Sequence, residues 1–259
     1  MKHALRRVIG RAAPGRSGGV RVLLYHAIDD PHPADCLSLR VSRRQFLDQM
    51  AVLRDDAYAV VPLDAVFHPQ PDNGRLPVAI TFDDGYRTVA WAAAVLKDFG
   101  FPATFFVVPR FLDGVQSPAA YWEEWAYLTW GDLAALADHH EFAVGAHSTT
   151  HLDLRRCADA RLAWEISEAK LLLERRIGRA VTSFSYPFGR HDRRVRRAVE
   201  RAGYELACTS RYGLNRSPGS RYAVHRTEVA GRDSLRDFHW KLRGKYDWLA
   251  HWQDLGPLP

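Results

Sequence analysis

The stretch that decides the fold is Val78–Tyr86, with the sequence VAITFDDGY. Its first five residues are typical of a buried strand in a parallel sheet. The strand ends at two adjacent carboxylates, Asp83 and Asp84, which are costly to bury unless they are paired or bind a cation. Consecutive side chains of an extended chain point in different directions, so one aspartate can bind a metal while the other faces a substrate. The alternative is an ordinary solvent-exposed Asp-Asp-Gly turn.

Short apolar runs alternate with amphipathic stretches on both sides of this strand. Repeated strand-then-helix units predict an α/β fold with a parallel sheet and crossover helices, and about seven such strands are enough to close a barrel. The pattern alone leaves an open, doubly wound sheet as the alternative. The predicted strands are Val20–Tyr25, Tyr58–Leu63, Val78–Phe82, Ala103–Val108, Phe142–Ala146, Thr182–Tyr186, Leu206–Ser210 and Tyr222–Arg226, and the predicted helices are Arg43–Arg54, Ala90–Phe99, Asp132–Asp138, Asp159–Ile177, Arg193–Ala202 and Leu235–Trp248.

A second polar cluster, HSTTH at residues 147–151, follows the predicted strand Phe142–Ala146. Functional groups of parallel α/β folds gather at the carboxyl ends of the strands. Two histidines four residues apart lie one above the other on a helical turn and can share a cation. The alternative is a helix start capped by Ser or Thr, with two unconnected histidines.

The two clusters together provide the groups needed for metal-assisted hydrolysis. Two imidazoles, His147 and His151, and one carboxylate form a three-ligand set for Zn²⁺ or a similar divalent ion such as Co²⁺, Ni²⁺ or Mn²⁺. The second carboxylate beside them is then the candidate general base for the attacking water.

TFDDGY followed by HSTTH resembles the polysaccharide deacetylases of the NodB-homology type (carbohydrate esterase family 4), with similarity from about Val20 to about Val229. The resemblance implies a single-domain, distorted (β/α) barrel. It also implies residue roles. Asp83 matches the catalytic base, and Asp84, His147 and His151 match the metal ligands.

A third motif, FSYPFG, contains Ser185, Tyr186 and Pro187 and also resembles the family pattern. By that resemblance, a backbone N–H near Tyr186 and Pro187 stabilises the oxyanion. Many members carry an arginine where Ser185 stands, and that arginine braces the catalytic aspartate. The resemblance implies that Arg226 takes over this role here, and a surface pair between Arg226 and Glu228 is the alternative.

The general acid is expected near the amino terminus. Many family members carry it in a late Leu-x-His motif, which is absent here, and His225 and His239 stand in the wrong context. The early Leu24-Tyr25-His26 instead resembles the poly-N-acetylglucosamine deacetylase subgroup, which implies that His26 protonates the leaving amine. Histidine titrates near neutral pH and suits this role. The alternative is a structural His26 that bonds the backbone.

The implied activity is removal of an N-acetyl group from an amino sugar, which yields acetate and a free amine. The alternatives are a relative acting on a formamido sugar or a non-sugar amide, and a metal-free glycan-binding pseudoenzyme. Trp122, Trp125 and Trp130 have flat faces that could stack on sugar rings, although packing inside the protein is equally compatible with them.

The 259-residue chain carries 36 basic and 30 acidic residues, a net charge of +6. We expect a basic extension at residues 1–19 and a catalytic domain at residues 20–259. No apolar stretch matches a signal peptide or a membrane span, which predicts a cytoplasmic protein, with weak attachment to an anionic membrane surface as an option. A nucleotide-linked, lipid-linked or small glycoside substrate fits that location. No nucleic-acid motif accompanies the charge, and nothing in the sequence sets an oligomeric state.

Overall fold

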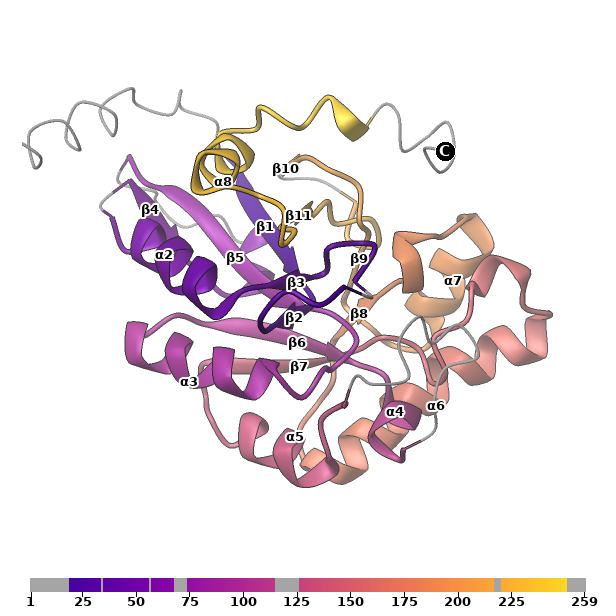
Figure 1. Ribbon diagram of the computed structural model, residues 1–259. Helices are drawn as coiled ribbons and strands as arrows, with labels where there is room; N and C mark the ends of the chain where they lie inside the picture. The colour runs from indigo at the N-terminus through magenta and orange to yellow at the C-terminus, as the bar shows by residue number, and fades with distance from the viewer. Residues whose placement is uncertain are drawn as a thin grey trace, which may run out of the picture.

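A curled sheet of nine strands forms the centre of the computed structural model, which describes residues 19–33, 35–55, 57–67, 74–114, 126–216 and 220–250 (Figure 1). The main path of the sheet is β10-β1-β5-β6-β7-β8-β9, with β11 also paired to β1 and β4 to β5. Its strands are β1 (Val20–Tyr25), β4 (Tyr58–Val60), β5 (Leu76–Phe82), β6 (Ala103–Val107), β7 (Phe142–Ala146), β8 (Ser183–Ser185), β9 (Leu206–Cys208), β10 (Leu214–Asn215) and β11 (Thr227–Glu228). A separate pair joins β2 (Ala27–Ile28) to β3 (Arg40–Val41).

The winding of the sheet confirms the predicted barrel-like α/β fold. Strands β5 to β9 are parallel neighbours in chain order, without the reversal that marks a doubly wound open sheet. The predicted sheet was purely parallel, but β10 pairs antiparallel to β1. Among the described residues, no helix is both long and apolar enough to cross a membrane.

The helices pack around the sheet and begin at sequence-encoded caps. Figure 1 shows α3, α5 and α6 along one side of the sheet, with α8 near β1. Capping boxes start α2, α5 and α8, where a Ser or Thr side chain and a residue three positions on satisfy each other's backbone N–H. The helices are α2 (Arg43–Leu53), α3 (Val89–Phe99), α4 (Pro109–Leu112), α5 (Trp130–Ala137), α6 (Asp159–Ile177), α7 (Arg193–Arg201) and α8 (Leu235–Leu242), with short 3₁₀ turns at Leu63–Val66, Leu154–Arg156 and Pro187–Gly189.

The last predicted strand, Tyr222–Arg226, is wrong. Only Val224 forms a bridge, to Cys208 of β9, and pairing with β1 starts at Thr227. Between these two points the N–H of Arg226 donates to the carbonyl oxygen of Arg211 instead of a sheet partner. This segment therefore connects β9 to β1 across the open side of the curled sheet and carries Arg226 into the interior.

The pairing registers bring four strand ends to one edge of the sheet. Residue Tyr25 of β1 lies opposite Phe82 of β5, and Ala146 of β7 lies opposite Phe184 of β8. The residues that follow these strands therefore meet at the carboxyl edge, where functional groups of such folds gather. Aromatic rings fill the core below this edge, including the stacked pair Phe82 and Phe105, with ring centroids 5.0 Å apart.

Candidate active site

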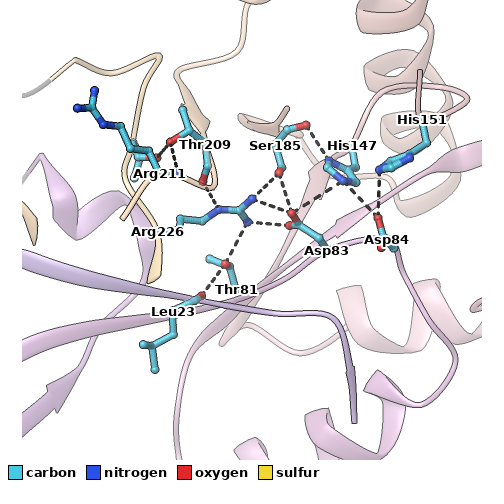
Figure 2. Close-up of polar contacts among 11 residues, drawn as sticks. Leu23, Thr81, Asp83, Asp84, His147, His151, Ser185, Thr209, Arg211 and Arg226 are labelled. Carbon is cyan, nitrogen blue, oxygen red and sulfur yellow. Dashed lines mark hydrogen bonds and ion pairs between the residues drawn. The ribbon is translucent and has the colours of Figure 1, made fainter. Parts of the chain in front are cut away.

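Asp83 and Asp84 follow β5 in a tight turn. The Asp83 N–H donates to the carbonyl oxygen of Tyr25 at 2.9 Å, which extends the pairing of β1 with β5. Asp84 and Gly85 then take left-handed φ angles of 71° and 76°, and a Cβ on Gly85 would come within 3.1 Å of the Val107 side chain. Both carboxylates are buried and face different partners, so the solvent-exposed turn is excluded (Figure 2).

Arg226 holds Asp83 through two parallel hydrogen bonds. Its Nη1 donates to Oδ1 of Asp83 and its Nη2 to Oδ2, both at 2.7 Å (Figure 2). This fork geometry is the strongest form of a carboxylate–guanidinium contact. Arg226 is 0% exposed, so the alternative of a surface pair with Glu228 is wrong. Burial raises the pKa of Asp83, but the charge and hydrogen bonds of Arg226 together with the nearby imidazoles of His147 and His26 outweigh burial and hold that pKa below its ordinary value.

Ser185, which stands where the resemblance leads one to expect an arginine, completes this contact. Its Oγ donates to Asp83 Oδ2 at 3.0 Å and accepts from Arg226 Nη2 at 2.8 Å. Arg226 also donates to the carbonyl oxygen of Thr209 at 2.8 Å and to the hydroxyl of Thr81 at 3.3 Å. The sequence alone did not identify Ser185 as a partner of Asp83, although its small side chain in place of an arginine was the available signal.

Asp84, His147 and His151 form the one group of potential metal ligands found among the described residues, with ligand atoms within 4.8 Å of one another. Asp84 Oδ1 lies 3.3 Å from Nε2 of His147 and 3.3 Å from Nε2 of His151. In a tetrahedral zinc site with ligands about 2.0–2.1 Å from the ion, neighbouring ligand atoms lie about 3.3–3.4 Å apart. The one carboxylate and two imidazoles present therefore fit a divalent ion such as Zn²⁺.

A hydrogen bond to the backbone of Ser185 orients the imidazole of His147. Its Nδ1 lies 2.8 Å from the carbonyl oxygen of Ser185, which can only accept, so Nδ1 carries a hydrogen and Nε2 is the nitrogen directed at Asp84, 3.3 Å from its Oδ1. Burial lowers the pKa of His147, but Asp83 and Asp84 outweigh burial and raise it. Burial, together with His147, lowers the pKa of His151 to about 4 despite Asp84, so the His151 imidazole is neutral near pH 7.

The HSTTH segment is a strained loop, so the predicted helical turn is wrong. Ser148 and His151 adopt left-handed φ angles of 58° and 60°, and the His151 N–H donates to Ser148 Oγ at 2.9 Å. Asp84 and Phe188 are also left-handed, so four of the five such non-glycine residues described lie at this site. Each costs about 1–2 kcal/mol relative to a right-handed conformation. Strained backbone conformations of this kind cluster at functional sites of proteins.

His26 lies directly beside the two aspartates. Strands β1 and β5 pair in register up to their last residues, so His26 is level with Asp83. The imidazole is close enough to act electrostatically on Asp83, Asp84 and His151. Its Nδ1 is buried and has no hydrogen-bond partner in the described part of the chain, so that atom makes no bond to the backbone of the kind that a purely structural histidine would need.

The expectation for Tyr186 and Pro187 is corrected. The Tyr186 N–H already donates to the carbonyl oxygen of Cys208 at 3.1 Å, and its hydroxyl donates to the carbonyl oxygen of Tyr222 at 3.1 Å. Proline has no N–H. Neither residue therefore offers a free donor to an oxyanion. The next residue, Phe188, is 40% exposed.

An aromatic wall of Tyr86, Phe111, Tyr127 and Phe188 lies beside His151, and the sequence did not single it out. The rings of Tyr86 and Tyr127 stack at 5.3 Å between centroids, and Phe111 lies 4.4 Å from Tyr127 and 6.0 Å from His151. Phe188 meets His151 edge-on at 4.7 Å. Tyr86 and Phe111 are buried, so Phe188 and the partly exposed Tyr127 provide the apolar surface of this wall beside His151.

Of the three tryptophans considered for sugar stacking, the structure describes Trp130. Trp122 and Trp125 lie outside the described residues. Trp130 begins α5, where its indole N–H donates to Asp113 at 2.7 Å and Arg176 lies over its ring at 4.9 Å. Packing at the start of a helix therefore explains Trp130.

Comparison with known proteins identifies the family. The polysaccharide deacetylase profile matches residues 70–207, more than half of the chain. YxkH of Bacillus subtilis (strain 168), which is named for polysaccharide deacetylases, is 28% identical over 213 residues, covering 81% of this chain and 71% of YxkH.

Solved structures agree with this assignment. BC0361, a polysaccharide deacetylase from Bacillus cereus, superposes with a TM-score of 0.71 at 26% identity over 86% of this chain and 69% of its own. IcaB from Ammonifex degensii superposes with a TM-score of 0.70 at 25% identity over 87% of this chain and 97% of its own. The chain belongs to the polysaccharide deacetylase family.

Proposed function

We propose that this protein is a metal-dependent deacetylase that hydrolyses the N-acetyl group of an amino sugar. The observation that carries the proposal is the adjacency of two differently held aspartates. Asp84 Oδ1 lies 3.3 Å from an Nε2 of each of two imidazoles, and Asp83 forms an ion pair with Arg226 at 2.7 Å. One carboxylate is thus arranged as a ligand and the other as a base.

Each site residue has one chemical task in this proposal. Asp84, His147 and His151 would hold the divalent ion, which when bound supplies Lewis acidity toward the amide carbonyl and acidifies water. Asp83 takes the proton of the attacking water, and its contact with Arg226 keeps it ionised for that step. His26 gives a proton to the departing amine, because an amide anion is too basic to leave unaided.

The acetyl and sugar assignments rest on the relatives. BC0361 is a named polysaccharide deacetylase, and the matched family profile carries the same name. The aromatic wall beside His151 suits an acetyl methyl group or the apolar face of a sugar ring. A formamido sugar is the second candidate, because the same ligands and base would serve it.

A substrate panel tests the proposal. The zinc-loaded protein is incubated with N-acetylglucosamine oligomers, a nucleotide-linked N-acetylamino sugar, a lipid-linked one, a formamido sugar and a non-sugar acetamide, and released acetate or formate is measured. We expect acetate from at least one N-acetylamino sugar, at a rate well above that from the non-sugar acetamide. Formate release alone would replace the acetyl assignment, and hydrolysis of only the non-sugar amide would sink the sugar assignment.

We predict that His26→Ala lowers amide turnover by about 10²-fold or more while metal content and thermal stability stay close to wild type. The loss should be smaller with an aryl acetate ester, whose leaving group needs no proton. His239→Ala and His225→Ala are the controls, since His239 lies on α8 and the His225 backbone is bonded to Asn215. Near-wild-type turnover in His26→Ala with a collapse in His225→Ala would move the acid role to the late histidine.

A further inference from the structure

Helix α6 carries a fully buried glutamate, Glu165, which contacts the HSTTH loop. Glu165 is 0% exposed, although glutamate is rarely buried without strong partners. The chemistry proposed above does not use it. Its position eighteen residues after His147 in the sequence gives no hint of a connection with the ligand loop.

The Glu165 carboxylate is saturated by donors from the loop and from its own helix. Oε2 accepts the backbone N–H groups of Thr149 at 3.0 Å and Thr150 at 2.8 Å. Oε1 accepts the Thr150 hydroxyl at 2.5 Å and the guanidinium of Arg161 at 2.6 and 2.9 Å. The Thr149 hydroxyl also donates to the Glu165 carbonyl oxygen at 2.9 Å. Both residues at the centre of the loop are therefore fixed to one residue of α6.

These contacts lie between the two histidine ligands. Ser148 and His151, which flank the anchored threonines, hold the left-handed φ angles that aim His147 and His151 at Asp84. A short loop of non-glycine residues does not keep such angles unless its surroundings impose them. The Thr149 and Thr150 N–H groups, both bonded to the buried Glu165 carboxylate, provide that restraint.

We infer that Glu165 is a positioning residue for metal binding, which sets the loop so that both imidazoles reach one ion. The inference rests on the proposed metal-dependent function and deepens it. Outer-shell partners of this kind change metal affinity by about 10–100-fold when they are removed.

Two nearly isosteric substitutions of Glu165 separate the effect of its hydrogen-bond acceptor from the effect of its side-chain volume. In Glu165→Gln, one amide oxygen can still accept from the Thr149 and Thr150 N–H groups, whereas Glu165→Met has similar length and no acceptor. The matched control is Glu168→Met, which makes the same change three residues along α6. For each protein we would measure zinc dissociation by chelator competition, hydrogen exchange of the peptide spanning residues 147–151 without metal, and the unfolding temperature without metal.

We expect Glu165→Met to weaken zinc binding by about 10–100-fold and to speed amide exchange in residues 147–151, with Glu165→Gln within about 3-fold of wild type in zinc affinity. Glu168→Met should match wild type in both measurements. A folded Glu165→Met protein that binds zinc as tightly as wild type overturns the inference.

If Glu165→Met does not fold, Thr150→Val tests the same contact, because it removes one donor from Oε1 and leaves the carboxylate in place. Weaker zinc binding then supports the inference, and unchanged binding contradicts it. If the wild-type protein does not bind zinc at all, the result contradicts the proposed metal-dependent function itself. Equal binding by wild type and variant contradicts only the role of Glu165.

Discussion

Asp83→Asn is expected to retain metal and to lose about 10²–10⁴-fold in turnover, because general-base catalysis contributes a factor of that size. Asp83 lies 3.8 Å from the nearest His147 nitrogen, whereas Asp84 lies 3.3 Å from both imidazoles, so the metal should depend on Asp84. The measurement is kcat for acetate release at saturating zinc, together with zinc content after desalting.

The control is the neighbouring substitution. Asp84→Asn removes the shared carboxylate of the ligand group and should lower zinc affinity directly, with activity partly restored by excess zinc. If instead Asp83→Asn loses zinc and Asp84→Asn keeps it, the roles of the two aspartates are exchanged. Equal zinc loss in both variants would mean that both carboxylates are ligands.

Arg226→Met is expected to destabilise the metal-free protein by about 3–5 kcal/mol, because it leaves the Asp83 carboxylate buried without its partner. For a chain of this size, that corresponds to a fall in Tm of roughly 10 °C. Arg226→Lys should recover little of the loss, since an ammonium cannot form the two parallel hydrogen bonds of the guanidinium fork.

The loss of unfolding free energy in Arg226→Met should depend on pH. In the wild type, Arg226 holds the folded-state pKa of Asp83 below its unfolded value, so the pair stabilises the fold above that unfolded value and the contribution is lost as pH falls through the folded one. In Arg226→Met, burial is opposed only by the weaker effects of His147 and His26, so the pKa of Asp83 rises and its carboxyl is neutralised by milder acidification than in the wild type. The difference in unfolding free energy should therefore be larger at pH 8 than at pH 4.5.

A double variant checks this account of Arg226. The variant that combines Asp83→Asn with Arg226→Met leaves no unpaired charge of this pair in the interior. Its loss of unfolding free energy should therefore be smaller than the sum of the losses in the two single variants. If the two losses of unfolding free energy are simply additive, or if the loss in Arg226→Met does not change with pH, the pair of Asp83 and Arg226 is not what stabilises this region.

The elements that could be predicted from the sequence are those with a complete local pattern. The helix Asp159–Ile177 forms with the predicted bounds because its apolar stripe runs unbroken and Gly178 ends it in a left-handed conformation. The strand Val20–Tyr25 is likewise as predicted, since its apolar residues, preceded by two glycines, favour a buried strand despite Arg21. The polar residues at two predicted strand ends then indicated the two aspartates and two histidines that the fold brings together, and the family resemblance implied the role of each.

The parts that could not be predicted depend on contacts distant in sequence. The segment around Arg226 was expected as a strand because its residues favour one, but the ion pair with Asp83, 143 residues away, turns the arginine inward. The HSTTH loop was expected to be helical from its spacing, but its Thr149 and Thr150 N–H groups donate to Glu165, and the loop takes a strained conformation instead. Glu165 itself looks like any helical glutamate next to Arg161.

The most direct test of the central claim is acetate release by one preparation before and after metal exchange. The purified protein is treated with a chelator, its metal content is measured, and its activity on the best substrate of the panel is assayed before and after addition of Zn²⁺ or Co²⁺. We predict that activity disappears with the metal and returns at about one ion per chain, and that His147→Ala recovers only at much higher zinc concentrations. Full activity in a preparation shown by elemental analysis to be free of metal would contradict the account.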